Sequence, residues 1–354
     1  MARREKASVA ILGATGAVGQ KFVRLLENHP WFEIGALAAS ERSAGRPYAE
    51  AVSWKQPSEI PSAAAAMTVQ SCSAELDCPI VFSGLDSSVA GGFERQFARR
   101  GAWVFSNPKN HRMDADVPLV IPELNPDHLQ LVPIQQKKRG WSGAIVTNAN
   151  CSTIILALSL GPLQRRFGLK SVQAVTFQAI SGAGYPGVPS WDVLGNVVPY
   201  IGGEEEKIES ETQKILGGLG EGGIDPAPIR ISAQANRVAV EEGHLECVSV
   251  EFHDPPSQQD ILDCWRDFRG LPQQLELPSA PHRPILVNNQ PDRPQPRLDV
   301  NAGQGMSITI GRLRPCPVLD FKYVVLGHNT IRGAAGASIL NAELVETAGS
   351  RKSG

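Results

Sequence analysis

The chain lacks any apolar run of the roughly 18 residues that a membrane helix requires. Its charges nearly balance, with 34 Lys and Arg against 36 Asp and Glu, so we expect neither nucleic acid nor an anionic membrane surface as a partner. The six cysteines form no CxxC pair and no His/Cys cluster at metal-ligand spacing. These absences predict no metal site and no disulfide framework, and they favour a reducing, cytoplasmic location.

A chain of 354 residues is longer than one hydrophobic core usually supports, which predicts two domains. In the first part, short apolar stretches alternate with helical spacing, as in a doubly wound parallel sheet. The expected strands are 8–12, 33–39, 79–83, 101–106 and, less regularly, 118–121, with a helix at 17–28. Longer alternating stretches predict a second, α+β domain with a mixed or antiparallel sheet at 171–178, 245–252, 306–313 and 318–326. An Ala-rich helix at 333–347 could pack back on the first domain.

A glycine turn joins the first strand to the first helix. Its GxxGxxG spacing would let the backbone approach a pyrophosphate, whose charge the helix N-terminus would receive. The spacing alone is a weak signal, because plain strand–helix turns also contain glycine. The strand before it and the amphipathic helix after it favour a dinucleotide site. The candidate cofactor residues here are Gly13, Thr15, Gly16, Ala17, Val18 and Gly19.

The end of the second strand bears on the choice of cofactor. An NAD site usually places an acidic residue there to hold the ribose 2′-hydroxyl. Here Ser40, Arg42 and Ser43 could instead receive a 2′-phosphate, which favours NADP. Glu41 lies among them and leaves NAD open.

Cys151 is the residue that best indicates the chemistry. It follows a polar turn and precedes the apolar run 154–160, so we expect its thiol at or near a helix N-terminus. Backbone N–H groups and the helix dipole at such a position favour the nucleophilic thiolate. A cysteine nucleophile together with a nicotinamide cofactor indicates aldehyde or acyl redox chemistry.

Several other polar residues are candidates to support this cysteine. His244 lies directly before a predicted strand, seven residues after Arg237. Gln178 ends another strand and could orient a bound carbonyl, while the following Ser181–Gly182 turn could approach a nicotinamide. Taken singly, a histidine is more often a surface or core residue, and a charge run such as 204–207 is more often a solvated helix start.

Taken together, seven segments resemble the aspartate-β-semialdehyde dehydrogenases, in the branch found in archaea, fungi and some bacteria. Their order and spacing are specific as a set, and they cover nearly the whole chain. They are GATGAVG (13–19), SNPKNHRM (106–113), NANCST (148–153), FQAISGAGYPG (177–187), GGEEEKIESET (202–212), RVAVEEGH (237–244) and NTIRGAAG (329–336).

The resemblance implies the architecture of glyceraldehyde-3-phosphate dehydrogenase. A Rossmann-like NADP-binding domain would span 1–150 and be completed by a C-terminal helix within 329–354. Residues 151–328 would form the catalytic and dimerisation domain. The resemblance also implies a homodimer or homotetramer, with segment 185–203 and strands of the second domain at the interface.

The implied reaction is NADPH-dependent reductive dephosphorylation of β-aspartyl phosphate to aspartate β-semialdehyde, which feeds lysine, threonine and methionine synthesis. Cys151 would form a thioacyl intermediate, with His244 as general acid/base and Gln178 orienting the substrate. The implied substrate-binding residues are Arg237 for the α-carboxylate, Glu204 for the amino group, Arg112 and Lys207 for phosphate, and Asn150 for the acyl pocket. Ser181, Gly182 and Asn329 would approach the cofactor. Glu204 is preferred to Glu205 because the family pairs a Glu with a Lys three residues later.

The sequence leaves alternatives. A malonyl-CoA reductase of the same fold would keep the cysteine, histidine and NADP turn, but would need no group for a substrate amine. N-acetyl-glutamyl-phosphate reductases normally have a Pro-Gly pair before the cysteine, and it is missing here. Glyceraldehyde-3-phosphate dehydrogenase shares the architecture, but the acidic residue that usually ends its second strand is absent here. A non-catalytic NADP sensor would not need the complete Cys, His, Arg and Gln set.

Overall fold

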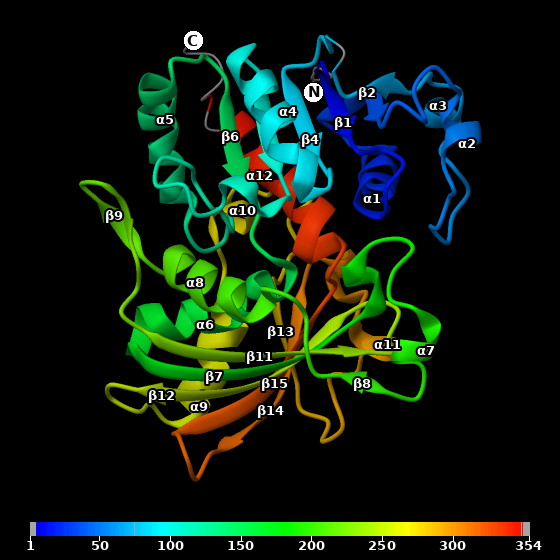
Figure 1. Ribbon diagram of the computed structural model, residues 1–354. Helices are drawn as coiled ribbons and strands as arrows, with labels where there is room; N and C mark the ends of the chain where they lie inside the picture. Colours follow the sequence, from blue (N-terminus) through cyan, green and yellow to red (C-terminus); the bar gives the residue numbers. More distant parts are fainter. Residues whose placement is uncertain (1–4, 74, 348, 350–354) are drawn as a thin grey trace.

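The computed structural model describes residues 5–73, 75–347 and 349, and it places two β-sheets one above the other (Figure 1). The upper sheet has six parallel strands in the order β3-β2-β1-β4-β5-β6. Their bounds are β1 Ala7–Leu12, β2 Phe32–Ala39, β3 Gln70–Ser71, β4 Ile80–Ser83, β5 Trp103–Ser106 and β6 Ala144–Thr147. The strand order reverses between β1 and β4, which is where doubly wound sheets bind their ligands. The predicted fold of the first part is confirmed.

Helices cover both faces of this sheet. They are α1 Ala17–Leu26, α2 Tyr48–Ala51, α3 Ser62–Ala65, α4 Ser87–Arg99 and α5 Leu131–Arg139, with the 3-10 turns Lys109–His111 and Pro126–Gln130. The C-terminal helix α12 (Gly336–Thr347) also packs here, because Ile339, Ala342 and Val345 belong to the apolar cluster around β1 and β4. The last helix therefore returns to the first sheet, as the sequence predicts.

The lower sheet is mixed, with the order β13-β14-β15-β12-β7-β11-β8. Its strands are β7 Leu169–Gln178, β8 Val197–Val198, β11 Arg230–Val238, β12 His244–Phe252, β13 Ile285–Asn288, β14 Ile308–Pro315 and β15 Phe321–Gly327. Helices α6 (Cys151–Phe167), α8 (Glu204–Ile215) and α9 (Gln258–Asp267) pack on one face of it (Figure 1). Burial alternates along β7 and β12, since only one face of each strand meets these helices.

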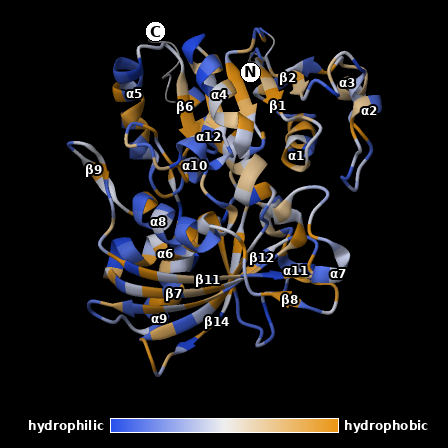
Figure 2. Ribbon diagram, viewed as in Figure 1, coloured by the Kyte–Doolittle hydropathy of each residue, from blue (hydrophilic) through white to orange (hydrophobic). Residues whose placement is uncertain are grey.

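Shorter elements complete the second half. They are the hairpin β9 Gly218–Gly220 and β10 Gly223–Asp225, helices α7 Ser190–Val193, α10 Leu271–Gln274 and α11 Pro296–Asp299, the 3-10 turns Ile180–Ala183 and Ala302–Gly305, and the π-turn Ile331–Ala335. Figure 2 shows apolar residues concentrated along the strands of both sheets, whereas α8 exposes a hydrophilic face. Within the described ranges, no helix is long and apolar enough to cross a membrane.

One strand predicted from the sequence needs correction, and one long strand was missed. Residues 118–121 form only an isolated bridge, between Leu119 and Thr147, because Pro118 and Pro122 bracket this stretch and cannot donate ladder hydrogen bonds. The edge position next to β5 belongs instead to β6. The long strand β11 was not predicted, since small and polar residues fill most of its positions.

Candidate active site

Three neighbouring strands bring the predicted site residues to one edge of the lower sheet. Gln178 ends β7, and Arg237 lies directly beside it in the parallel β7–β11 register. His244 begins β12, which runs antiparallel to β7 on its other side. The ends of β7 and β11 therefore meet the start of β12, although these residues come from three separate segments of the chain.

The thiol of Cys151 faces this edge from the helix above it. Cys151 is the first residue of α6, and its predecessor Asn150 caps the helix by accepting hydrogen bonds from Ser152 N (3.0 Å) and Thr153 N (3.1 Å). The distance from Cys151 Sγ to His244 Nε2 is 3.2 Å. The predicted helix is thus confirmed, and its first residue contacts the predicted histidine.

The turn after β7 orients the imidazole of His244. The backbone N–H of Ala179 donates to His244 Nδ1 at 3.1 Å, so a neutral ring carries its proton on Nε2, facing the sulfur. The carbonyl of Ala179 accepts from Arg237 Nη1 at 2.7 Å. A Cβ at Gly182 would lie 2.9 Å from Arg237 Nη1 and 3.1 Å from His244 Cε1, so a side chain at this position would displace one or both of these groups. Gly182 is therefore within contact of both side chains.

Burial controls the ionisation of the Cys151–His244 pair. Desolvation, reinforced by Glu204, raises the pKa of the Cys151 thiol to about 12, although Arg112 and Arg237 oppose this shift. Desolvation, reinforced by Arg237, lowers the pKa of His244 to about 3. The expectation that a helix N-terminus makes Cys151 a thiolate is therefore wrong for this site, because burial outweighs the backbone N–H groups. The pair at neutral pH is a thiol beside a neutral imidazole.

Glu204 faces the same site from α8. It is buried, and its carboxylate accepts from Asn150 Nδ2 and Lys207 Nζ, both at 2.8 Å. Burial alone would raise the pKa of Glu204, but Lys207 and Asn150 outweigh it, so that the pKa is lowered and the group is ionised. Glu205 instead accepts from Ala235 N at 2.9 Å. Of the two glutamates, Glu204 is the one that contacts Asn150, the neighbour of Cys151.

Arg112 reaches the site from the loop after β5. Its Nη1 donates to Glu211 Oε1 at 2.9 Å, and its Nη2 donates to the carbonyl of Asn107. Its Nε is buried and has no hydrogen-bond partner within the described residues, so the guanidinium retains a donor for an anion. Glu211 was not singled out from the sequence, although it lies seven residues after Glu204 and thus on the same helix face.

Asn329 connects the two halves of the site. Its Oδ1 accepts from Gly243 N and its Nδ2 donates to Ser181 Oγ, both at 2.8 Å. Glu242 accepts from Ser181 Oγ at 3.1 Å and pairs with Lys21 of α1 at 3.0 Å. Ser181 and Asn329 therefore lie between the lower sheet and the first helix of the upper domain, as expected for residues that approach a cofactor.

The glycine turn of the upper sheet fits a dinucleotide. Gly13 has φ +75°, and a Cβ there would lie 2.8 Å from Gly84 O. A Cβ at Gly19 would lie 2.2 Å from Gly13 O, so α1 can pack this close only without a side chain. Gly16 is the N-cap of α1 and forms no side-chain cap, which leaves the first N–H groups for a pyrophosphate. Thr15, Ala17 and Val18 are half-buried around it.

The loop after β2 fits the extra phosphate of NADP. Ser43 N donates to Ser40 O at 2.8 Å and closes a turn, on which Ser40 and Arg42 are exposed. Glu41, which could have favoured NAD, accepts a hydrogen bond from Ser71 Oγ of β3. The loop therefore presents Ser40, Arg42 and Ser43 next to a carboxylate that already accepts a hydrogen bond.

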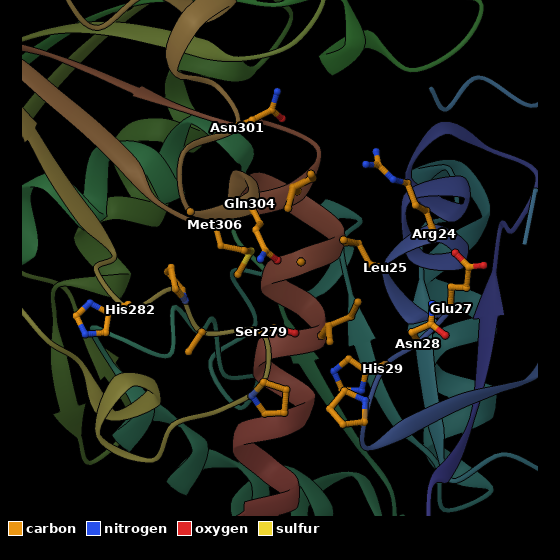
Figure 3. A pocket seen from close by; sticks show the side chains of 18 residues that line it. Arg24, Leu25, Glu27, Asn28, His29, Ser279, His282, Asn301, Gln304 and Met306 are labelled. Carbon is orange, nitrogen blue, oxygen red and sulfur yellow. The ribbon is translucent and has the colours of Figure 1, made fainter. Parts of the chain in front are cut away.

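A separate cavity of about 790 Å³ lies between the end of α1 and segments 278–282 and 301–306 (Figure 3). Figure 3 shows Leu25 and His29 on one wall, with Gln304 and Met306 on the other. It contains none of the predicted catalytic residues.

No group of three or more His, Cys, Asp or Glu side chains that could hold a metal ion is found within residues 5–73, 75–347 and 349.

Glu246 is an unexpected buried acid beneath the site. It lies two residues after His244 on β12, on the same face of the strand, and is fully buried. Neither carboxyl oxygen has a hydrogen-bond partner in the described part of the chain. Desolvation, reinforced by the charge of Glu204, raises the pKa of Glu246 well above its usual value.

Glu246→Gln should therefore stabilise the protein more at pH 8 than at pH 5. The unfolded chain ionises Glu246 above about pH 4.3, whereas the raised pKa makes the folded protein release this proton only at higher pH. The stability linked to this proton is full below that pH and falls as pH rises towards the folded pKa, by up to about 1.4 kcal/mol per unit. Denaturant unfolding of both proteins at the two pH values tests this. An equal difference at pH 5 and pH 8 would argue against a protonated Glu246.

The comparisons agree with this geometry. Residues 8–132 match the family model "Semialdehyde dehydrogenase, NAD binding domain", and residues 160–332 match "Semialdehyde dehydrogenase, dimerisation domain". An aspartate-semialdehyde dehydrogenase of Methanothermobacter thermautotrophicus is 50% identical over 342 residues, covering 96% of this chain and 98% of the relative. The Saccharomyces cerevisiae enzyme of that name is 47% identical over 358 residues, covering 96% and 98%.

Solved structures show the same relationship. A crystal structure of aspartate semialdehyde dehydrogenase with NADP from Candida albicans superposes with a TM-score of 0.89 at 46% identity, covering 96% of this chain and 98% of the other. Aspartate semialdehyde dehydrogenase II from Vibrio cholerae gives 0.78 at 25% identity, covering 97% and 99%.

A dinucleotide-binding domain joined to a domain that holds a cysteine–histidine pair defines the class of dehydrogenases that act through a thiol. The two matched models and the relatives then specify the family. This chain belongs to the semialdehyde dehydrogenase family, among the aspartate-semialdehyde dehydrogenases. The resemblance inferred from the seven segments is confirmed.

Proposed function

We propose that the protein is an NADP-dependent, phosphorylating aspartate-semialdehyde dehydrogenase. In the biosynthetic direction it would convert β-aspartyl phosphate and NADPH to aspartate β-semialdehyde, phosphate and NADP⁺. The observation that carries this proposal is the 3.2 Å contact between Cys151 Sγ and His244 Nε2. That contact lies at the same sheet edge as Arg237, with Glu204 and Arg112 facing it from the adjoining elements.

The chemistry requires a nucleophile and a route for protons. Cys151 would attack the acyl carbon of the substrate, forming a C–S bond as the bond to phosphate breaks; the leaving phosphate accepts the thiol proton. A nicotinamide dinucleotide held by the glycine turn 13–19 would supply the hydride that reduces the thioacyl carbon to the aldehyde, and the Cys151 sulfur would then be released. His244 is the proposed general acid/base: with Nδ1 held by Ala179 N–H, its ring proton lies on Nε2, where it would donate a hydrogen bond that stabilises the negative charge developing on the sulfur or the substrate oxygen. Gln178 ends β7 beside Arg237 and would orient the substrate carbonyl.

The remaining groups would recognise the rest of the substrate. Glu204, held as a carboxylate, would bind the substrate ammonium, a role that malonyl-CoA could not use because it has no amine. Arg112, whose Nε has no partner among the described residues, and Lys207 would bind the phosphate. Asn150, which bonds Glu204, would line the acyl pocket.

Arg237→Lys should raise the KM for aspartate semialdehyde by about 10- to 100-fold, with a smaller effect on kcat. A planar guanidinium can bind a carboxylate through two hydrogen bonds, whereas an ammonium offers a point charge. Steady-state kinetics with varied aldehyde at saturating phosphate and NADP measure this change. An unchanged KM would remove Arg237 from the carboxylate-binding role.

The direct test is reduction of NADP by the purified protein supplied with aspartate semialdehyde and phosphate, followed by absorbance. Parallel reactions replace NADP by NAD or omit phosphate. Turnover that needs aldehyde and phosphate, and that is faster with NADP, would support the proposal. No turnover from folded protein that binds NADP, together with oxidation of NADPH by malonyl-CoA, would contradict it.

We also propose that the protein works as a homodimer or homotetramer. The matched dimerisation domain supports an oligomer. Segment 185–203 exposes the large apolar side chains Tyr185, Trp191, Leu194 and Tyr200, with Trp191 94% exposed, so we propose this segment and the open face of the lower sheet as the interface.

For the domain limits we propose that residues 1–150 together with 329–354 form the first domain, and that residues 151–328 form the second. A cytoplasmic location stays a prediction, consistent with six unpaired cysteines.

A further inference from the structure

One buried side chain links Arg112 to the N-cap residue of the helix that begins with Cys151. Glu211 is 1% exposed and accepts two hydrogen bonds with its two carboxylate oxygens. One comes from Arg112 Nη1 at 2.9 Å, and the other comes from the backbone N–H of Asn150 at 2.6 Å. Asn150 in turn caps the helix that begins with Cys151. A single carboxylate therefore spans the arginine and the N-cap.

Helix α8 also contacts the main chain of the loop that contains Arg112. Glu204, Lys207, Glu211 and Lys214 recur along one face of this helix. Lys214 Nζ donates to the backbone carbonyls of Arg112 (2.7 Å), Asp114 (2.9 Å) and Val117 (3.0 Å). Arg112 is thus fixed at its main chain by Lys214 and at its guanidinium by Glu211.

We propose that Glu211 is a positioning residue for phosphate: it holds the Arg112 guanidinium at a fixed place relative to Cys151. This inference rests on the proposed function, in which Arg112 binds the phosphate that leaves or attacks the thioacyl carbon. The fixed geometry aligns that phosphate with the carbon bound to Cys151 Sγ. Glu211 itself touches neither substrate nor cofactor.

Two opposite effects of removing this charge can be weighed. A carboxylate beside Arg112 reduces the attraction between the guanidinium and an anion, so its loss could tighten phosphate binding. However, both partners of Glu211 are donors, and an amide at this position can accept from only one of them. The other donor would then face the amide NH₂ group of the new side chain, where no hydrogen bond can form. A buried hydrogen bond to a charged group changes an equilibrium constant by about 10- to 100-fold. The loss of a fixed position for the Arg112 guanidinium therefore outweighs the gain in its attraction for phosphate.

The test is Glu211→Gln, with the exposed Glu206→Gln on the same helix as matched control. In aldehyde oxidation by the full-length protein, Glu211→Gln should raise the KM for inorganic phosphate by about 10- to 100-fold. The KM for aldehyde, the NADP affinity and the rate of Cys151 alkylation by iodoacetamide should stay within about twofold of wild type. Glu206→Gln should match wild type throughout. A uniform loss in all these quantities, or an unchanged phosphate KM, would overturn the proposal.

A double-mutant cycle with Arg112→Met makes the test sharper. If Glu211 acts through Arg112, Glu211→Gln should add no further rise in phosphate KM to the Arg112→Met protein. Additive effects would contradict the proposal. Should Glu211→Gln fail to fold, Glu211→Asp replaces it, because its shorter side chain cannot span both donors and should give the same selective rise. Wild-type protein without phosphate-dependent turnover would instead refute the proposed function itself.

Discussion

Replacing Cys151 by alanine should reduce phosphate-dependent turnover by at least about 10,000-fold while changing NADP affinity by less than about twofold. Without the sulfur no thioacyl intermediate can form, and no other side chain at the sheet edge offers a comparable nucleophile within the described residues. The fold should persist, because alanine favours helices and Asn150 still caps α6. Steady-state kinetics and a fluorescence titration with NADP measure the two effects.

Cys316→Ala is the matched control for this prediction. Cys316 lies in the turn between β14 and β15, away from the site, and it is partly exposed. Its replacement should leave turnover within about twofold of wild type, as expected for a surface substitution away from the site. Substantial activity in Cys151→Ala, or a comparable loss in Cys316→Ala, would show that Cys151 is not the nucleophile.

Arg332→Met should lower the free energy of unfolding by about 3–5 kcal/mol. Arg332 donates to both carboxylate oxygens of Glu123, at 2.8 and 2.6 Å, and both side chains are fully buried. Removing the guanidinium leaves a buried, unpaired carboxylate, which is far more costly than losing an exposed pair. Activity should fall as well, because the adjoining Gly333 packs on Cys151, where an added Cβ would lie 2.6 Å from Cys151 Cβ.

A second variant separates the charge effect from lost packing. The double replacement Glu123→Gln with Arg332→Met removes both charges, so it should be less destabilised than Arg332→Met alone. Denaturant unfolding of the wild type and the two variants at one pH measures the difference. A double variant that is no more stable than the single one, or a single variant that loses less than about 1 kcal/mol, would contradict a strong buried pair.

Much of the fold was predictable because local patterns and tertiary structure agree. The glycine turn requires the backbone geometry that Gly13 and Gly19 adopt, and the apolar run after Cys151 forms the buried helix α6. Strand β11 was missed because its burial comes from neighbours that are distant in sequence. The stretch 118–121 is apolar enough for a strand, but its flanking prolines prevent a regular ladder.

The site was predictable in its residues but not in its electrostatics. Local sequence context singled out Cys151 and His244, the family resemblance added a role for Arg237, and the structure places the three together. The raised pKa of Cys151 depends on burial by segments far along the chain, which no local pattern reveals. Glu211 and Glu246 were overlooked for the same reason, since a glutamate in a polar helix or an alternating strand usually faces solvent.

The most direct test of the account is mass spectrometry of the protein after incubation with aspartate semialdehyde and NADP in the absence of phosphate. The account predicts an acyl group on the peptide that contains Cys151, formed as NADPH appears and removed when phosphate is added. NADPH formation with no adduct on Cys151, or an adduct on another residue that phosphate discharges, would contradict a mechanism through this thiol.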